Sequence, residues 1–337
     1  MKKIAALSLV AATMAFASTA DDIADLQSQI DKLKTKQSKI NAQSANDNIK
    51  WGVDLRTAID NINYDMANGK SYGNDSLMSL RLWLNMAYAA DEKNIFKGRL
   101  SMNKAFGADF GVGGDMASMR GFGMGSLFDW TGNEALSDNS LKVQQAYWLY
   151  MGDDAFGQGM DWTFSIGRRP STNGFLANLS QDDPAASPLA HVINVEFDGL
   201  STSIDLSKPT GVNGMNLKLC AGRGSTNAVP LFYNATPYAD DPEGLDNVDL
   251  AGIIFVPYDD GQFIVKTNYY KAFNLPGMEV DMSTGQPLGF KQFGDMDGAA
   301  LSVLVDGVTE DGYGSDVKLF GSLAWTKSNP FDGEAML

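Results

Sequence analysis

The stretch LMSLRLWLNMAYAADEKNIFKGRLSMNK, residues 77–104, decides the fold. In residues 78–88 an apolar side chain occupies every second position, and the residues between them are Ser79, Arg81, Trp83, Asn85 and Ala87. Residues 91–94 resemble a turn, after which the same alternation returns and places Arg99 on the polar parity. Because successive side chains of a strand point to opposite faces, the stretch predicts a long antiparallel hairpin with one apolar and one charged face.

Such hairpins are typical of a transmembrane β-barrel, where lipid contacts one face of the sheet and water the other. The predicted fold class is therefore all-β, an antiparallel transmembrane β-barrel over residues 49–337, preceded by a short coiled-coil helix. The same alternation and its turn signals predict about twelve strands in all. They are expected within residues 49–66, 77–89, 95–104, 141–151, 161–169, 192–198, 200–206, 215–222, 248–257, 262–273, 299–308 and 316–327.

The residues within and between the predicted strands also indicate bulges, tight turns and long loops. The alternation of the first strand slips by one residue at Asn61, which predicts a β-bulge. Asp198-Gly199 and Asp260-Gly261 are typical of tight hairpins. Two segments rich in Gly, Asp, Ser and Pro, residues 106–140 and 170–191, predict long loops, whereas the other turns near them are short. Long loops on one side and short turns on the other are the asymmetry of an outer-membrane barrel.

The N-terminus carries a targeting signal over residues 1–20. Lys2 and Lys3 precede an apolar run, and small residues then offer cleavage after Ala17 or Ala20. The mature chain is therefore expected to be exported, and with the alternating strands this predicts the outer membrane of a Gram-negative bacterium. Lipid and lipopolysaccharide would be its immediate partners there.

Residues 21–46 change to a helical period. Apolar side chains and one Gln are spaced alternately three and four residues apart, at Ile23, Leu26, Ile30, Leu33, Gln37 and Ile40. This heptad seam predicts a short periplasmic coiled coil that joins copies of the chain into a homo-oligomer through residues 23–40. The alternative is a single amphipathic helix that packs on, or plugs, the domain behind it.

Composition excludes several functions. The net charge of -15 argues against nucleic-acid binding. With Cys220 as its single cysteine and His191 as its single histidine, the chain cannot form an internal disulfide or a His/Cys metal cluster. The run from Asp295 to Gly298 resembles half of a calcium loop, but lacks the later glutamate and is expected to be a turn. We therefore expect no catalytic residues, no metal, no cofactor and no enzymatic activity.

Several motifs resemble one known family. They are Arg81-Leu-Trp-Leu-Asn-Met-Ala-Tyr, Gln145-Ala-Tyr-Trp-Leu-Tyr, Gly167-Arg-Arg-Pro-Ser-Thr-Asn-Gly-Phe and Val256-Pro-Tyr-Asp-Asp-Gly-Gln, with others between and after them. The chain is similar along nearly its whole length to exported proteins of Campylobacterota grouped as domain of unknown function 3373. The resemblance implies a porin-like outer-membrane barrel behind a periplasmic helix. It also implies that further residues follow in the family, so the present chain is expected to lack a C-terminal part.

The residues most relevant to function are basic and lie on the inward parity. If the apolar parity contacts lipid, the lumen is lined by Arg56, Arg81, Lys97, Arg99, Lys142 and Arg169. The long loop 106–140 is acidic and supplies Asp109, Asp115, Asp129, Glu134 and Asp138. An acidic loop folded against a basic wall would create a transverse field at a constriction, which passes small hydrophilic solutes. Alternatively, the arginines pair with carboxylates such as Asp54 or Asp60 and only make the barrel rigid.

Three functions are compatible with this pattern. The first is a channel for passive diffusion of small hydrophilic solutes or ions. The second is a structural or adhesive surface protein whose barrel is plugged. The third is a soluble exported carbohydrate-binding protein, with Trp83, Trp148 and Tyr150 as a platform on the polar parity. The apolar stripe at residues 78–88 disfavours the third, because a soluble sheet would leave a large apolar patch exposed.

Overall fold

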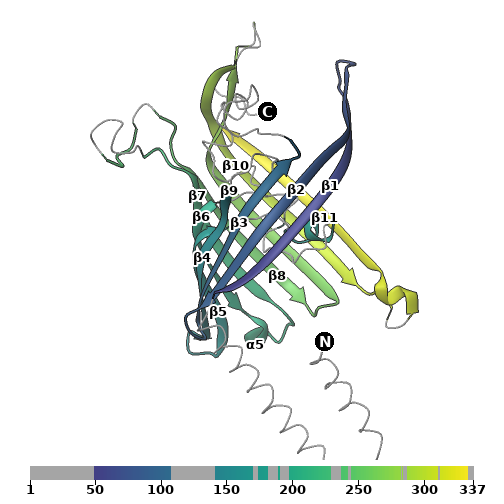
Figure 1. Cartoon of the computed structure of the whole chain (residues 1–337). Coiled ribbons are helices and arrows are strands. Elements are labelled where there is room, and N and C mark those ends of the chain that lie inside the picture. The colour runs from purple at the N-terminus through teal and green to yellow at the C-terminus, as the bar shows by residue number, and fades with distance from the viewer. Residues whose placement is uncertain are drawn as a thin grey trace, which may run out of the picture.

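The described residues form eleven strands of one antiparallel sheet, in which each strand pairs with its neighbours in the sequence (Figure 1). The computed structural model describes residues 49–107, 141–169, 174–180, 189, 197–228, 237–241, 244–281, 283, 287–309 and 312–332. The predicted signal peptide and coiled-coil helix lie outside these residues. The strands are β1 (Lys50–Asp65), β2 (Ser71–Ala89), β3 (Asn94–Ala105), β4 (Lys142–Ala155), β5 (Met160–Arg169), β6 (Phe197–Asp205), β7 (Asn216–Ser225), β8 (Val248–Asp259), β9 (Phe263–Val280), β10 (Pro287–Asp306) and β11 (Lys318–Pro330).

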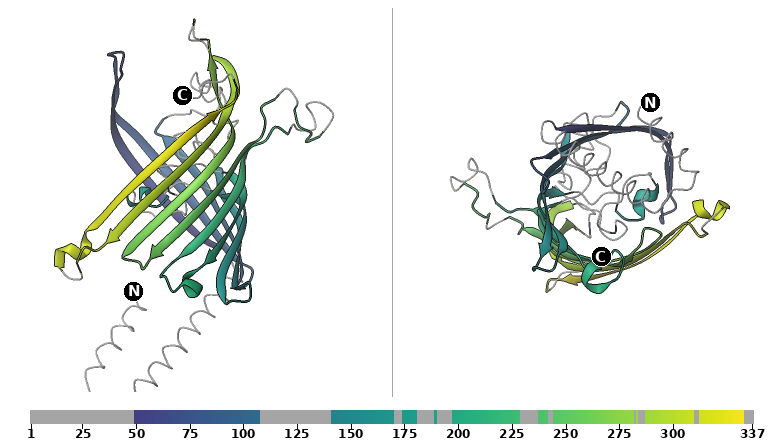
Figure 2. Two further views of the ribbon diagram at one scale, coloured as in Figure 1. Left: turned by 180° about the vertical axis from the view of Figure 1, so that it is seen from behind. Right: turned by 90° about the horizontal axis from the view of Figure 1, so that it is seen from below.

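The sheet curves around a central space, so that it has a concave inner face and a convex outer face (Figure 2). Among the described residues, β1 pairs only with β2 and β11 only with β10, so the sheet is open between its two edge strands. Within the described ranges, three short helices accompany the strands: η1 (Ala177–Ser180), α5 (Ser207–Thr210) and η2 (Gly312–Asp316). In the described part of the chain, no helix is long and apolar enough to cross a membrane.

The two ends of the sheet differ in the length of their connections. At the end that lies lower in Figure 1, β2 joins β3 through residues 90–93, β4 joins β5 through 156–159, and β8 joins β9 through 260–262. At the opposite end, the connections between β3 and β4, β5 and β6, and β7 and β8 are all much longer. The three longest connections therefore gather at one end, as predicted, although the short connections 66–70 and 281–286 also lie at that end. Asp260-Gly261 is the tight turn that the sequence indicated.

The distribution of polar and apolar side chains is inverted relative to a soluble sheet. The buried polar side chains of the described strands all lie on the inner face: Arg81, Ser101, Asn103, Gln144, Ser165, Ser201, Asn268 and Ser302. Large apolar side chains are exposed on the outer face of consecutive strands, for example Val53, Met78, Phe96, Val143, Ile166, Leu200, Leu219, Ile253, Tyr269, Leu301 and Leu323. The alternation read from residues 77–104 thus extends to the whole sheet.

Two predicted turns are wrong. Asp198-Gly199 is not a hairpin but lies inside the single strand β6, which replaces two of the predicted strands and reduces the count to eleven. The physical reason is close strand approach, because a Cβ on Gly199 would lie 2.3 Å from the carbonyl oxygen of Ala221. The Asp295–Gly298 run is also strand, within β10, where register shifts around Gly294 bend the chain without reversing it. A register shift does lie between Asp60 and Ile62, as predicted at Asn61, but the extra residue is on β2, between Asn74 and Leu77, and not on the first strand.

Candidate functional site: the basic inner wall

On the inner face of β2 and β3, an indole lies between two guanidinium groups. The guanidinium carbons of Arg81 and Arg99 lie 3.4 Å and 3.8 Å from the ring centroid of Trp83. At these distances they occupy opposite faces of the ring, because on one face the two carbons would overlap. Trp83 is only 3% exposed, and adjacent strands supply the two arginines, β2 and β3. Cation–π contact of this kind stabilises positive charge where water is scarce.

A single carboxylate serves two of the arginines. Asp54 on β1 lies 3.4 Å from Arg56 Nε and 3.5 Å from Arg81 Nη2. The pairing that the sequence left open as an alternative therefore exists at this point of the wall. Arg99 instead donates to amide oxygens, to Asn85 Oδ1 at 2.7 Å and to Gln144 Oε1 at 3.5 Å. Positive side chains outnumber carboxylates on this face of β1–β4.

Lys97 and Lys142 complete the β3–β4 part of the wall. In the strand register Lys97 is opposite Tyr147, and Lys142 is opposite Ser101, which places both lysines on the face of Arg99. Both side chains are exposed. Both lysines therefore lie on the inner face, as the alternation of the sequence predicted.

Arg169 occupies a separate polar position at the loop end of β5. Its Nη1 donates to Ser165 and, at 2.8 Å, to Ser201 on β6, and the two serine hydroxyls lie 2.9 Å apart. The guanidinium carbon also lies 4.9 Å from the ring centroid of Tyr147 on β4. Three strands thus fix the direction of this side chain. The neighbouring Arg168 belongs to the outer face, where it lies 3.6 Å from Asp198.

Sequence reasoning missed two further cations of the inner face. Lys218 on β7 is opposite Ser203, and Lys266 on β9 is opposite the buried Ser302. Lys218 lies between Leu217 and Leu219, and Lys266 lies between Val265 and Thr267, so the parity rule could have identified both. Lys266 Nζ lies 4.5 Å from the ring centroid of Phe175, a residue of the segment between β5 and β6.

The described residues of that segment, 174–180 and 189, pack against the inner face of β9 and β10. Phe175 and Leu189 form a buried cluster with Ala300 and Leu304, against which Leu176, Leu179 and Ile264 also pack. Figure 2 (right) shows the short teal helix η1 inside the curve of the strands. A second cluster, of Leu250, Tyr270 and Ala272, lies beside it. This part of the wall is therefore apolar and covered.

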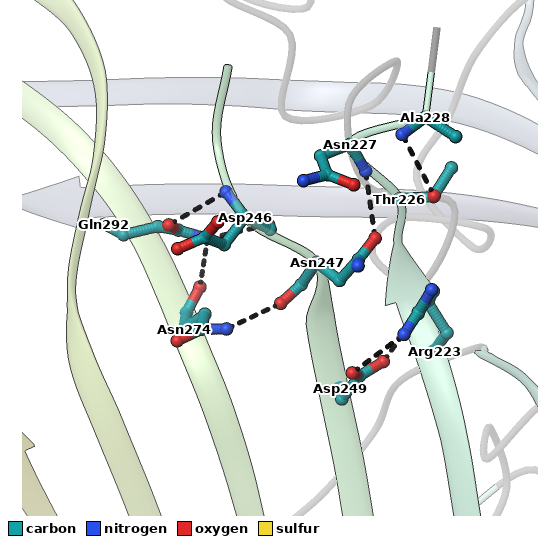
Figure 3. A network of polar contacts seen from close by, with 9 residues as sticks. All are labelled: Arg223, Thr226, Asn227, Ala228, Asp246, Asn247, Asp249, Asn274 and Gln292. Carbon is teal, nitrogen blue, oxygen red and sulfur yellow. Dashed lines mark hydrogen bonds and ion pairs between the residues drawn. The ribbon is translucent and has the colours of Figure 1, made fainter. Parts of the chain in front are cut away.

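Side-chain hydrogen bonds to the backbone fasten the loop end of this covered part (Figure 3). Gln292 on β10 donates to the carbonyl oxygens of Asp246 and Asn274, at 2.8 Å and 3.0 Å, and accepts from the Asp246 N–H at 3.0 Å. Asn274 in turn donates to the carbonyl oxygen of Asn247 at 2.9 Å. On the outer face nearby, Arg223 Nε donates to Asp249 at 2.7 Å. These contacts bind the end of the β7–β8 connection to β9 and β10.

At the short-turn end, a cavity of about 410 Å³ opens between the turns and β4–β7. Its lining includes Lys93, Asp153, Asp161 and Asp205. Lys93 lies 3.1 Å from Asp153, so the acidic lining is partly compensated. No group of three or more His, Cys, Asp or Glu residues within the described ranges could hold a metal ion.

Several predicted residues fall outside the described part of the chain. These are the constriction-loop residues Asp109, Asp115, Asp129, Glu134 and Asp138, together with His191. Cys220 is a free cysteine on the inner face, opposite Ser201. The aromatic platform is wrong, because Trp83 lies on the inner face whereas Trp148 and Tyr150 lie on the outer face.

Comparisons with known proteins give the family. The chain belongs to the family described as Protein of unknown function (DUF3373), whose model matches residues 71–337. A comparison with curated proteins found no match. Among solved structures, the chain is similar to Salmonella typhi OmpF in complex with daunomycin, with 12% sequence identity and a TM-score of 0.38 over 83% of this chain and 79% of that chain.

Proposed function

We propose that this protein is a porin-like channel of the outer membrane, through which small hydrophilic solutes or ions diffuse passively. The observation that carries the proposal is the inverted sheet, with polar side chains buried on the inner face and apolar side chains exposed on the outer face. A soluble protein would have to cover that outer face, whereas a bilayer satisfies it directly. The inner face would then surround the aqueous path.

The dimensions of the outer apolar face support the same proposal. On β2, outward side chains run from Met78 to Tyr88, ten residue steps apart. At about 3.3 Å per residue and a strand tilt of about 40°, ten steps correspond to about 25 Å, the height of the apolar band of a membrane barrel. Aromatic rings gather on the outer face near the short turns. Trp148 lies 6.1 Å from Phe164 and Tyr150 lies 5.2 Å from Trp162, as in an interfacial belt.

A plugged, structural barrel is the second candidate. The packing of Phe175 and Leu189 against the inner face of β10 favours it, because this segment occupies part of the central space. The two functions differ in a measurable property, since only a channel conducts ions.

The test is conductance of the folded chain in a planar bilayer, with reversal potentials measured across a salt gradient. Combined replacement of Arg81, Arg99 and Arg169 by Ser should shift ion preference toward cations, because three positive charges leave the wall of the aqueous path. The matched control replaces Arg168 and Arg223 by Ser, which removes arginines of the outer face and should leave the reversal potential unchanged. Absence of conductance in the folded parent protein would favour the plugged barrel.

A further inference from the structure

Donor groups without partners surround the Arg81–Trp83–Arg99 stack. Trp83 Nε1, Ser101 Oγ and Gln144 Nε2 are buried and have no hydrogen-bond partner in the part of the chain that the structure describes. Their side chains are between 0% and 3% exposed. Buried polar atoms normally find a partner, so three such atoms in one place indicate that a group is bound there.

The strand register brings these atoms together. Trp83 on β2 is directly opposite Ser101 on β3, and Ser101 is opposite Lys142 on β4. Gln144 lies at the bulge of β4, where its Oε1 accepts from Arg99. That hydrogen bond directs the oxygen of the amide toward Arg99 and leaves the NH₂ group as the atom without a partner.

The chemistry of the cluster is strongly biased toward donors. An indole N–H and an amide NH₂ can only donate, a hydroxyl can donate, and guanidinium groups donate through a planar fork. Two guanidinium groups that share one ring also repel each other, and an anion beside them would relieve that repulsion. Asp54 supplies negative charge to the Arg81 side of the stack, so the Arg99 side is the better position for a ligand.

We propose that Arg81, Trp83, Arg99, Ser101 and Gln144 form a binding site for an oxyanion, namely the carboxylate or phosphate group of a small solute. The proposal rests on the proposed function, because the anion would reach the site from the aqueous path inside the sheet. Arginine forks match the geometry of both groups, and hydrogen bonds to ionised groups are stronger where water is excluded. The channel would thus retain anionic solutes on one wall instead of only passing them.

The first experiment measures equilibrium binding and does not depend on conductance. Inorganic phosphate is titrated calorimetrically into the full chain folded in detergent, and acetate is titrated separately to decide between phosphate and carboxylate. We expect saturable binding that Arg99→Gln weakens by about tenfold or more, since a hydrogen bond to a charged group is lost. Trp83→Phe keeps an aromatic ring, smaller than the indole, but removes the N–H, and should weaken binding by a smaller factor.

The matched control is Arg223→Gln, which removes an arginine of the outer face and should leave the affinity unchanged. Ser101→Ala serves as a second test if Arg99→Gln does not fold. Equal affinities of Arg99→Gln and Arg223→Gln, or absence of saturable binding of both anions to the parent protein, would overturn the site. Binding without conductance would retain the site and reject the channel, whereas conductance without binding would reject the site alone.

Discussion

The inner face of β1–β5 and the inner face of β8–β10 follow the same two-residue alternation but carry different side chains. On the first, the basic half, Arg81 and Arg99 enclose Trp83, and Arg169 bonds to two serines. On the second, the packed half, Leu250, Tyr270, Ala300 and Leu304 are buried, and the segment that contains Phe175 covers part of it. Alternation therefore defines which face a residue is on, but not whether that face contacts water.

In the packed half, a glycine on one strand makes room for an aromatic ring of the neighbouring strand. A Cβ on Gly298 of β10 would lie 2.3 Å from the ring of Tyr270 on β9, so the ring fills the space that a side chain would need. Such aromatic covering of a glycine fixes strand register as well as filling the interior. In the basic half, guanidinium groups instead pack against both faces of the Trp83 ring.

The largest difference between the halves is expected when a carboxylate is introduced on each. Ala300→Asp places a charge in the cluster with Phe175 and Leu304, and should destabilise the fold by about 3–5 kcal/mol because the charge is buried without a partner. Ala58→Asp places the same group on the exposed inner face of β1 near Arg56, and should change stability by no more than about 0.5 kcal/mol. Urea unfolding in vesicles measures both, and similar costs would remove the distinction between the halves.

On the outer face, in contrast, replacement of an apolar residue by Arg should destabilise the fold by a similar amount in both halves. Leu82→Arg on β2 and Ile253→Arg on β8 each direct a charge toward lipid and should each cost about 2–4 kcal/mol. Ser79→Arg on the inner face of β2 is the control and should cost far less. A penalty for Ser79→Arg equal to that for Leu82→Arg would show that the faces are assigned incorrectly.

Shortening one buried side chain of the segment between β5 and β6 should destabilise the protein by a smaller amount. Phe175→Ala removes a ring that is 4% exposed from the packed half, and burial of a phenylalanine contributes about 1.5–3 kcal/mol. Because the strands remain paired, the sheet should persist while the segment loosens and conductance rises. The substitution removes no charge, so ion preference should not change. A fall in conductance would indicate that the segment shapes the path and does not restrict it.

The smallest expected effect is a pH-dependent loss of hydrogen-exchange protection in two short turns, one in each half. Asp91 accepts from the N–H groups of Lys93 and Asn94, and Asp260 accepts in the same way from Gln262 and Phe263. The side chain of Asn94 lowers the pKa of Asp91, and the backbone N–H of Phe263 lowers the pKa of Asp260. The turn chemistry is therefore shared, although the inner faces differ.

A lowered pKa in the folded state means that this stabilisation is complete above the usual carboxyl pKa and is lost as the pH falls through the folded value. Hydrogen-exchange protection of the four amides should drop by up to about tenfold between about pH 6 and about pH 3 in both turns. Asp91→Asn keeps the acceptor oxygen but does not titrate, so its turn should not respond. A response in one turn alone would contradict the shared chemistry.

The inward parity of Arg81 and Arg99 could be predicted from the sequence, because each lies between apolar neighbours in an uninterrupted strand. The same rule failed for Trp148 and Tyr150. A bulge at Gln144 and Gln145 places two consecutive residues opposite one residue of β3, which reverses the parity of everything after it in β4. Two adjacent glutamines give no signal of this reversal, since either could occupy either face.

The covered inner wall could not be predicted for a different reason. Phe175 and Leu189 lie in a connection without periodicity, and the residues they contact on β10 are more than one hundred positions away. The contacts of Gln292 with Asp246 and Asn274 likewise depend on tertiary placement. Lys218 and Lys266, in contrast, were within reach of the parity rule and were overlooked.

The most direct measurement compares two neighbouring arginines on β5. Arg169 lies on the inner face with Ser165 and Ser201, and Arg168 lies on the outer face with Asp198. Arg169→Ser and Arg168→Ser are each folded into planar bilayers, and reversal potentials are recorded across the same salt gradient. The account predicts a shift toward cation preference for Arg169→Ser and none for Arg168→Ser. Equal shifts, or no shift in either variant while the channel conducts, would contradict the assignment of the basic inner face to the aqueous path.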